Sequence, residues 1–308
     1  MNISRVKHFK VFQSKPLVLS VKSAIVLGAL FIMYFKLETL PSFLMYMHTS
    51  TFFMMLLFSV LNWHLEVLKW KALVKTMRNI SYSEALKQSL AGHTTAIVTP
   101  NKLGEYGAKA YFYKNDNPKK IMGLNFIANA HQLLATLFFG SFGLYYYLQQ
   151  HAQLPFHSQS VIVFYGAFIF LGSVFILKTK SGKKFLYHFR EIGLKTHLLT
   201  ALYAHIRYIV FSTQFFLILN SFEPEIAYLQ VAPVIWCMYL IASFIPTFSI
   251  IDFAIKGSVA LLLFSSFPVE EFSIISSALL MWAFNFGIPA FLGMYFISRA
   301  RPYKRTSI

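Results

Sequence analysis

The chain has 308 residues, of which 56% are hydrophobic and 13% are charged, about half the charged share of an ordinary soluble domain. Its formal net charge of +17 would suit a nucleic-acid-binding protein, but the basic residues form short clusters between apolar stretches and do not line one face of a soluble domain. We therefore expect a membrane protein without a nucleic-acid partner. The one cysteine, Cys237, excludes a disulfide or a thiolate metal site within the monomer. We predict no metal and no cofactor.

Six apolar stretches reach the length of about 20 residues that a helix needs to cross a bilayer. They are residues 17–35, 42–61, 121–147, 159–177, 197–219 and 272–297. The first follows a basic start and has no small-residue cleavage site, so we expect a retained helix and not a signal peptide. The sequence predicts an all-α, polytopic membrane protein with six full transmembrane helices.

The connections between these stretches alternate in charge, and short cytoplasmic connections collect Lys and Arg. The basic segments, which we place in the cytoplasm, are residues 1–22, 62–83, 114–120, 178–195 and 298–308. The segments with one Lys or none, which we place outside, are residues 36–41, 148–158, 220–226 and 268–271. The pattern predicts a multi-pass protein of the cytoplasmic membrane with both termini in the cytoplasm.

Two further apolar stretches connect segments of the same charge type and cannot be single crossings under this rule. Residues 84–113 lie between two basic segments, so we expect two short helices, 84–98 and 103–113, with a break at Thr99-Pro100-Asn101. Residues 227–267, broken at Ile245-Pro246-Thr247, join two outside segments. Each stretch is therefore predicted to be a re-entrant helical hairpin, one opening to each side of the membrane.

The two halves of the chain follow one plan with opposite orientation. Residues 1–150 and 155–300 each read as span, span, hairpin, span within a single integral membrane domain, residues 1–308. This is an inverted repeat, on which many transporters are built.

Each expected hairpin carries a proline and then an acidic and a basic residue four positions apart. In the first, Pro100 precedes Glu105 and Lys109. In the second, Pro246 precedes Asp252 and Lys256. On a helix such residues can pair, and the N-terminus of a short helix can hold an anion. Because charges inside a bilayer are costly, we expect a functional site, although each pair could instead only neutralise itself and fix its hairpin.

Three other residues belong to this picture. Lys102 lies beside the first break, and Arg207, the one arginine within an expected span, could bind a phosphate or pair with Asp252. His93 is interpreted as a hydrogen-bonded packing residue and not as a proton relay.

The segment from residue 65 to 113 resembles the membrane region of lysylphosphatidylglycerol synthases and related flippase-like integral membrane proteins. The matching positions are Lys69-Trp70, Ser83-Glu84-Ala85, Pro100, Gly104, Glu105 and Lys109. The second motif departs from the family pattern, because Ser249-Ile250-Ile251-Asp252 replaces a glycine-rich turn. The resemblance implies lipid translocation, or work with a lipid-modifying enzyme. The aminoacyltransferase domain of the synthases is not encoded in this chain, so we expect no enzymatic activity.

The functional hypothesis is a flippase-like protein that binds a lipid with an anionic or zwitterionic head group. The expected substrate-binding residues are Lys102, Glu105, Lys109, Arg207, Asp252 and Lys256, and the expected hairpin-break residues are Pro100, Gly104 and Pro246. One alternative is a membrane glycosyltransferase using a lipid-linked sugar, with Glu223 and Glu225 as its acidic residues. Another is a scaffold that binds a partner enzyme through residues 178–195. The oligomeric state is left open.

Overall fold

Four helical stretches of the computed structural model are long and apolar enough to cross a membrane. The structure describes residues 49–151, 189–245, 248–249 and 251–303. The expected spans 17–35 and 159–177, and Pro246, lie outside the described residues. Within the described part the chain is helical, apart from turns and one isolated bridge.

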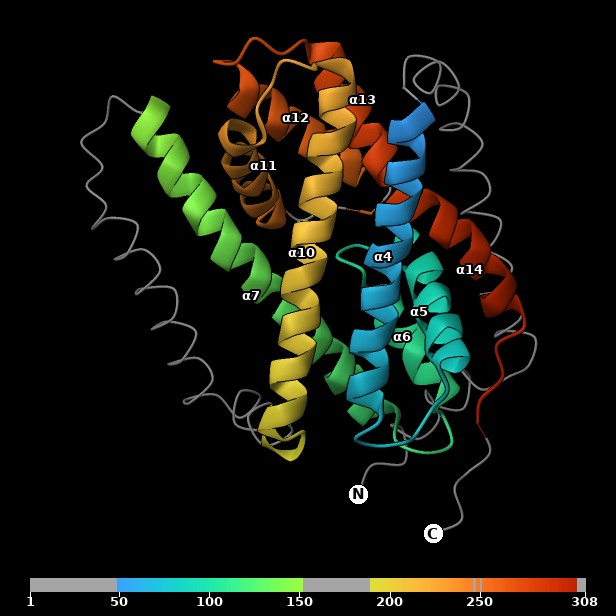
Figure 1. Ribbon diagram of the computed structural model, residues 1–308. Helices are drawn as coiled ribbons and strands as arrows, with labels where there is room; N and C mark the ends of the chain where they lie inside the picture. Colours follow the sequence, from blue (N-terminus) through green and yellow to red (C-terminus); the bar gives the residue numbers. More distant parts are fainter. Residues whose placement is uncertain (1–48, 152–188, 246–247, 250, 304–308) are drawn as a thin grey trace, which may run out of the picture.

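The four long stretches match four of the expected spans (Figure 1). Three are single helices, α4 (Thr49–Val74), α7 (Pro118–His151) and α10 (Leu194–Phe222). The fourth is continuous through α13 (Glu271–Trp282), the π-helix η1 (Ala283–Gly287) and α14 (Ile288–Ser298). These apolar helices indicate a membrane-embedded protein.

The end of α4 corrects one sequence-based boundary. The expected span ended at residue 61, with Lys69 and Lys71 in a cytoplasmic connection, but α4 continues to Val74 and buries Lys69. The charge is tolerated inside the molecule because Lys69 Nζ lies 2.7 Å from Glu66 Oε2, one turn earlier on the same helix.

Both broken stretches form pairs of short helices close to the expected boundaries. The first pair is α5 (Tyr82–Ile97) and α6 (Leu103–Phe112). The second is α11 (Tyr228–Ser243) and α12 (Asp252–Phe264). The α5–α6 pair fills the lower part of the view in Figure 1 and the α11–α12 pair the upper part. The two turns meet between them, where Pro100 and Phe248 form an antiparallel bridge.

Gly104 lets the first hairpin close tightly. A Cβ atom at this position would lie 2.2 Å from the carbonyl oxygen of Thr95 on α5, a distance that no side chain can occupy. The backbone N–H of Gly104 donates to Thr99 Oγ1 at 2.8 Å, which fixes the start of α6 to the turn. The expectation that Gly104 belongs to the hairpin break is consistent with this close approach of α5 and α6.

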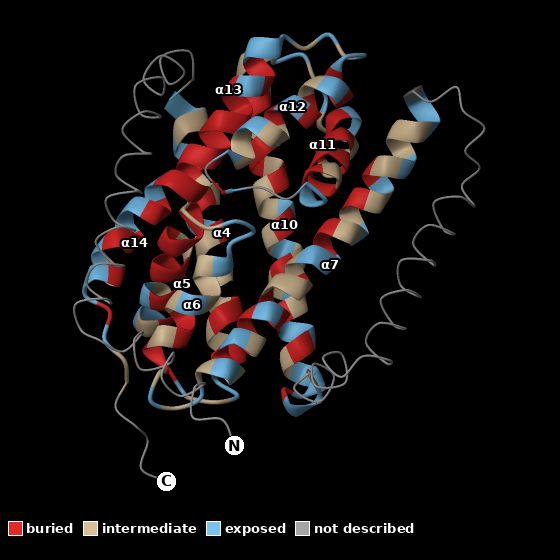
Figure 2. Cartoon of the chain, turned by 180° about the vertical axis from the view of Figure 1, so that it is seen from behind, coloured by how far each residue is buried: buried red, intermediate tan, exposed pale blue. Residues whose placement is uncertain are grey.

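The buried apolar side chains form two clusters, one around each hairpin. The first joins α4, α5, α6 and α7 through residues such as Trp70, Ala91 and Ile121. The second joins α10 to α14 through residues such as Phe215, Met238 and Leu280. Figure 2 shows buried residues on the faces that the helices turn toward one another. Many large apolar side chains stay exposed on the outer faces, as expected where lipid replaces water.

The two ends of the helical assembly differ in charge. One end, at the bottom of Figure 1, holds the C-terminus of α4 and the N-termini of α7 and α10. Its basic residues are Lys75, Arg78, Lys114, Lys119, Lys120, Arg190, Lys195, Arg299 and Arg301. The opposite end carries the acidic residues Glu223, Glu225, Glu270 and Glu271.

Candidate functional site

A cavity of about 390 Å³ lies where the turns of the two hairpins approach the long helices. Its wall includes residues of α4, α5, α7, α10, α11, α12, α13 and η1, and both hairpin turns. Charged and polar side chains share this wall with aromatic rings. They are Asn62, His93, Asn101, Lys102, Gln132, Arg207, Asp252, Lys256 and Asn285, and Phe211, Phe215, Tyr239, Phe253, Trp282 and Phe286. Such a mixture of aromatic walls and a few converging polar groups is typical of ligand sites.

Four of the six predicted binding residues reach this cavity although they are far apart in the sequence. They are Lys102, Arg207, Asp252 and Lys256. Glu105 and Lys109 are not among the residues that line it. The structure therefore divides the predicted set into a group that faces the cavity and a pair that does not.

Lys102 reaches the cavity from a strained turn. Asn101 and Lys102 both have a positive φ, at 48° and 59°, in the left-handed region that residues other than glycine rarely adopt. Asparagine tolerates this region, but lysine has no such local compensation. Backbone strain of this kind concentrates at ligand and switch sites, where the surrounding structure holds it in place.

The acid–base pair of the second hairpin faces the cavity in a half-exposed setting. Lys256 Nζ lies 2.6 Å from Asp252 Oδ2, and each side chain is 31% exposed. The ammonium group also lies 5.3 Å from the centre of the Tyr239 ring. The predicted pairing over one helical turn is thus present, and both charged groups remain within reach of a ligand.

Arg207 reaches the cavity, but its ionic partner is not the one expected. The sequence suggested Asp252, whereas Arg207 Nη1 lies 2.9 Å from Glu66 Oε2 on α4. Its Nε donates to Asn62 Oδ1 at 2.8 Å and its Nη1 to Gln132 Oε1 at 3.1 Å. The expected pairing is wrong because α10 packs along α4, which brings Glu66 beside Arg207.

Sequence reasoning missed Glu66 and gave Lys69 no place in the site. Glu66 Oε2 lies within 2.9 Å of both Lys69 Nζ and Arg207 Nη1, so one carboxylate bridges two cations. The spacing of Glu66 and Lys69 is the one signal that could have revealed them, because an acid and a base three residues apart share a helical face. They were assigned to a loop once the span was ended at residue 61.

The π-helix η1 places a further polar side chain at the cavity. Asn285 Oδ1 accepts from Asn62 Nδ2 at 2.7 Å, and Asn285 Nδ2 donates to Gln214 Oε1 at 2.8 Å. Its carbonyl oxygen accepts from Trp63 Nε1 at 3.1 Å. π-Helical turns inside α-helices are frequent at functional sites, and this one connects α4, α10 and the last long helix by hydrogen bonds.

The acid–base pair of the first hairpin is buried and saturated. Lys109 is completely buried, and its Nζ lies 2.6 Å from Glu105 Oε1 and 2.8 Å from Asn125 Oδ1. The same ammonium group lies 4.1 Å from the centre of the Trp70 ring. These contacts occupy Lys109 fully, so the pair fixes α6 to α4 and α7 and offers little to a ligand.

The N-terminus of α6 is also occupied, which corrects the expectation of free N–H groups there. The N–H of Leu103 donates to Pro100 O, that of Gly104 to Thr99 Oγ1, and that of Glu105 to Lys102 O. The turn satisfies its own donors. An anion in the cavity would therefore meet the side chains of the hairpin turn and not the first N–H groups of α6.

His93 packs edge-on against Trp63, with ring centres 4.8 Å apart, and lies 4.1 Å from the ring centre of Phe286. This agrees with a packing role. Its Nε2, however, is buried and has no hydrogen-bond partner, so the expected hydrogen bond is not made by this atom. Because His93 lines the cavity, Nε2 is a polar group that a ligand or water could satisfy.

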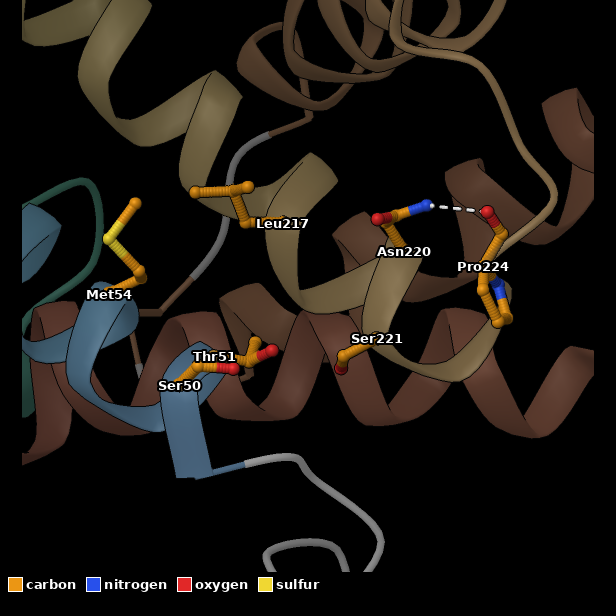
Figure 3. A pocket seen from close by; sticks show the side chains of 7 residues that line it. All are labelled: Ser50, Thr51, Met54, Leu217, Asn220, Ser221 and Pro224. Atoms are coloured by element: carbon orange, nitrogen blue, oxygen red, sulfur yellow. Dashed lines mark hydrogen bonds between the residues drawn. The ribbon is translucent and has the colours of Figure 1, made fainter.

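A second hollow lies away from this cavity. The hollow shown in Figure 3, of about 280 Å³ between α4 and α10, has no charged side chain in its wall, and Asn220 there donates to Pro224 O at 3.3 Å. Glu223 accepts from the backbone N–H of Glu270 and from Ser273 Oγ. Its carboxylate is therefore occupied at the start of α13, which argues against the acidic pair of the glycosyltransferase alternative.

The part of the chain that the structure describes has no group of three metal-ligating side chains.

Comparison with protein-family models, with curated proteins and with solved structures finds no match to this chain. The resemblance to the membrane region of lysylphosphatidylglycerol synthases therefore stays a prediction.

Proposed function

We propose that this chain binds a lipid with an anionic or zwitterionic head group in the cavity between the hairpin turns and translocates it across the cytoplasmic membrane. The observation that carries the proposal is the charge of the site. Among the side chains that line the cavity, three are cationic and one is a carboxylate. They are Lys102, Arg207 and Lys256, and Asp252.

An anionic head group would compensate the excess positive charge. Phosphate oxygens bind Lys and Arg by charge-assisted hydrogen bonds, which are stronger in a desolvated site than in water. Lys102 and Lys256 are placed to make such contacts from opposite hairpins, and Arg207 from the long helix α10. For a zwitterionic lipid, Asp252 would bind the amine of the head group while the three cations bind its phosphate.

The same proposal includes the membrane arrangement of the chain. The basic end would face the cytoplasm, following the positive-inside rule, and the acidic end would face outward. Together with the two expected spans outside the described residues, the four long helices would complete six crossings. The hairpins α5–α6 and α11–α12 would then enter from opposite sides as re-entrant segments of an inverted repeat.

This arrangement would give a lipid head group a way across. The bridge between Pro100 and Phe248 joins the two turns at the cavity, and irregular backbone at membrane depth is tolerated where it lines such a cavity. Movement of one hairpin away from the other would open the cavity to one side. The acyl chains would remain in the bilayer beside the exposed apolar faces.

Translocation can be tested in proteoliposomes of phosphatidylcholine that contain a trace of fluorescent phosphatidylglycerol. Bleaching by an impermeant reductant reports how fast the labelled head group exchanges between leaflets. Lys102→Asn keeps a residue that tolerates a positive φ and removes the charge. Lys256→Gln removes the second cation, and Lys87→Gln, on the exposed face of α5, is the matched control.

The wild type and Lys87→Gln are expected to exchange the labelled lipid at equal rates. Lys102→Asn and Lys256→Gln are each expected to slow the exchange by about tenfold, since a charge-assisted contact contributes about 1.5 to 3 kcal/mol. Equal rates for all four proteins, or no exchange above that of empty vesicles, would contradict the proposed function.

A further inference from the structure

Two buried histidines join α7 to α10 beside the charged network, and the proposed function makes no use of them. His131 on α7 is 4% exposed and His197 on α10 is 7% exposed. His131 Nε2 lies 3.3 Å from His197 Nδ1. The outer nitrogens also have partners, because His197 Nε2 lies 2.7 Å from Phe189 O and His131 Nδ1 lies 3.0 Å from Thr200 Oγ1.

The partners determine where the protons are when both rings are neutral. A carbonyl oxygen only accepts, so His197 Nε2 must carry a proton for Phe189 O. A neutral ring has one N–H, which leaves His197 Nδ1 as an acceptor and requires His131 Nε2 to donate to it. His131 Nδ1 is then unprotonated, and its partner Thr200 Oγ1 can donate to it.

The pair can take up one more proton without movement of a heavy atom. Thr200 Oγ1 also lies 2.8 Å from Thr196 O, so its hydroxyl proton can turn to that carbonyl. The oxygen then accepts from a protonated His131 Nδ1. A second added proton would have to bind His197 Nδ1, where it would face the N–H of His131 Nε2 at 3.3 Å. The hydrogen bonds thus accommodate one extra proton and oppose two.

We propose that His131 and His197 form a binding site for a single proton, and that its occupancy is coupled to the charge of the cavity. Histidine is the side chain whose ordinary titration lies closest to neutral pH. The site begins at the Phe189 carbonyl, beside the first turn of α10 at the basic end of the assembly. The proton site therefore lies nearer to the basic end of the assembly than to the acidic end.

The charged and titratable groups near the pair come from the helices packed against it. A positive charge on Lys69 of α4 or on His205 of α10 repels a positive charge on His131. From α6, Lys109 contacts α7 through Asn125. Before α10, Glu191 pairs with Lys120 of α7 at 3.5 Å. Helix α11 meets α7 further along, at Gly140 and Gly143.

Two contacts connect the pair to the cavity. Gln132, the neighbour of His131, accepts from Arg207 Nη1 and lines the cavity. Lys69, which acts on His131, shares the carboxylate of Glu66 with Arg207. A proton on the pair adds positive charge next to this network, which favours an anion in the cavity. By reciprocity, a bound anion favours the proton.

This coupling rests on the proposed function, since it takes the cavity to bind an anionic head group. The coupling would make the proton the driving ion for that function, because a lipid that binds together with a proton can be moved by a proton gradient. The proton site itself depends only on the hydrogen bonds of the two histidines and can be tested alone.

The first experiment measures the proton site in purified protein. Histidine-selective ¹⁵N labelling and NMR in detergent distinguish neutral from doubly protonated rings, and His131→Gln and His197→Gln assign the signals. Glutamine keeps an N–H donor in place of each Nε2 but does not titrate. Between about pH 8 and pH 4 one of the two rings is expected to become an imidazolium. Two independent imidazoliums, or two rings that stay neutral, would overturn the proposal.

The second experiment measures the coupling with dioctanoyl phosphatidylglycerol, whose phosphodiester does not titrate in this range. A pH-indicator dye in weak buffer reports proton uptake when the lipid is added. The wild type and the control His64→Gln, whose histidine is exposed on α4, are expected to take up protons and to bind the lipid about tenfold more tightly at pH 5 than at pH 8. His131→Gln is expected to bind with no uptake and no pH dependence.

The outcomes separate the two ideas. If phosphatidylglycerol does not bind to the wild type at all, the proposed function fails, whatever the NMR result. If it binds without proton uptake, or if His131→Gln takes up protons like the wild type, the coupling is wrong while lipid binding stands.

Discussion

The two hairpins carry the same acid–base spacing but place it in opposite surroundings. In the first hairpin Lys109 is completely buried and Glu105 is 12% exposed. In the second, Asp252 and Lys256 are each 31% exposed and line the cavity. The pair distances are equal at 2.6 Å. One spacing therefore has two settings, since the first pair fixes a helix and the second faces the cavity.

The difference follows from what packs against each pair. Helix α6 lies between α5 and α7, where Trp70 and Asn125 enclose the ammonium of Lys109. Helix α12 packs on α11 and α13, and its first turn meets the open cavity. Removing the lysine of the pair should therefore change the stability of the protein by different amounts in the two hairpins.

The largest effect is expected from breaking the buried pair. Lys109→Met leaves the carboxylate of Glu105 without its partner in a buried position, which costs about 3 to 5 kcal/mol. Thermal unfolding in detergent should show a large loss of stability. The double variant Glu105→Gln, Lys109→Met removes both charges and should recover most of it. A single variant as stable as the wild type would contradict the account of the first hairpin.

The next largest effect concerns one glycine in each hairpin. Gly104→Ala would place a Cβ atom 2.2 Å from Thr95 O, and the required backbone shift should cost about 1 to 3 kcal/mol. At Gly257 of α12 the nearest atom, Ala278 Cβ, would be at 3.7 Å. Gly257→Ala should therefore be neutral or should stabilise the helix by up to about 1 kcal/mol. Melting temperatures in detergent give the comparison, and equal shifts would refute it.

A smaller effect is expected at the start of each hairpin. Ser81 forms a capping box with Glu84 at the N-terminus of α5, whereas Ala227 leaves α11 without a side-chain cap. Ser81→Ala should cost about 1 kcal/mol, and Ala227→Ser should gain a similar amount or less. Unfolding temperatures of the two variants and of their combination test this, since the two changes should be additive across such separate sites.

The capping box also gives a pH dependence. The backbone N–H of Ser81 donates to the Glu84 carboxylate and holds the pKa of Glu84 below its ordinary value. The stabilisation is therefore present above about pH 4.5, the ordinary pKa of this glutamate, and is lost as the pH falls through the lower pKa of the folded protein. In Glu84→Gln this loss of melting temperature at low pH should be smaller.

The smallest change in stability is expected in the second pair. Lys256→Gln breaks an ion pair that is a third exposed, and such pairs contribute about 0 to 1 kcal/mol. Its melting temperature should stay close to that of the wild type. A loss as large as that of Lys109→Met would mean that both pairs only fix their hairpins.

Local patterns predicted the helical elements well. The charge alternation and the two prolines gave the break between α5 and α6 and the break between α11 and α12, and the helices α5, α6 and α11 begin and end within a few residues of expectation. Hydropathy alone misplaced the end of α4, because a helix whose charges pair inside the molecule has no apolar signal at that point. Glu66 and Lys69 were lost from the site for this reason.

The partners of the charged residues could not be predicted in the same way. Arg207 meets Glu66, and His131 meets His197, only because α10 packs against α4 and α7. The first contact joins residues 141 positions apart and the second joins residues 66 positions apart. No local spacing encodes them. Likewise, the burial of Lys109 and the exposure of Lys256 depend on neighbouring helices and not on the motif that both share.

The most direct measurement is the affinity of purified protein for dioctanoyl phosphatidylglycerol, determined by isothermal titration calorimetry. The proteins to compare are the wild type, the two cavity variants Lys256→Gln and Lys102→Asn, and the control Lys87→Gln. The account predicts that the two cavity variants lose about tenfold or more in affinity at unchanged melting temperature, while the control binds like the wild type. Equal affinity in all four proteins would contradict the claim that the cavity between the hairpin turns binds an anionic head group.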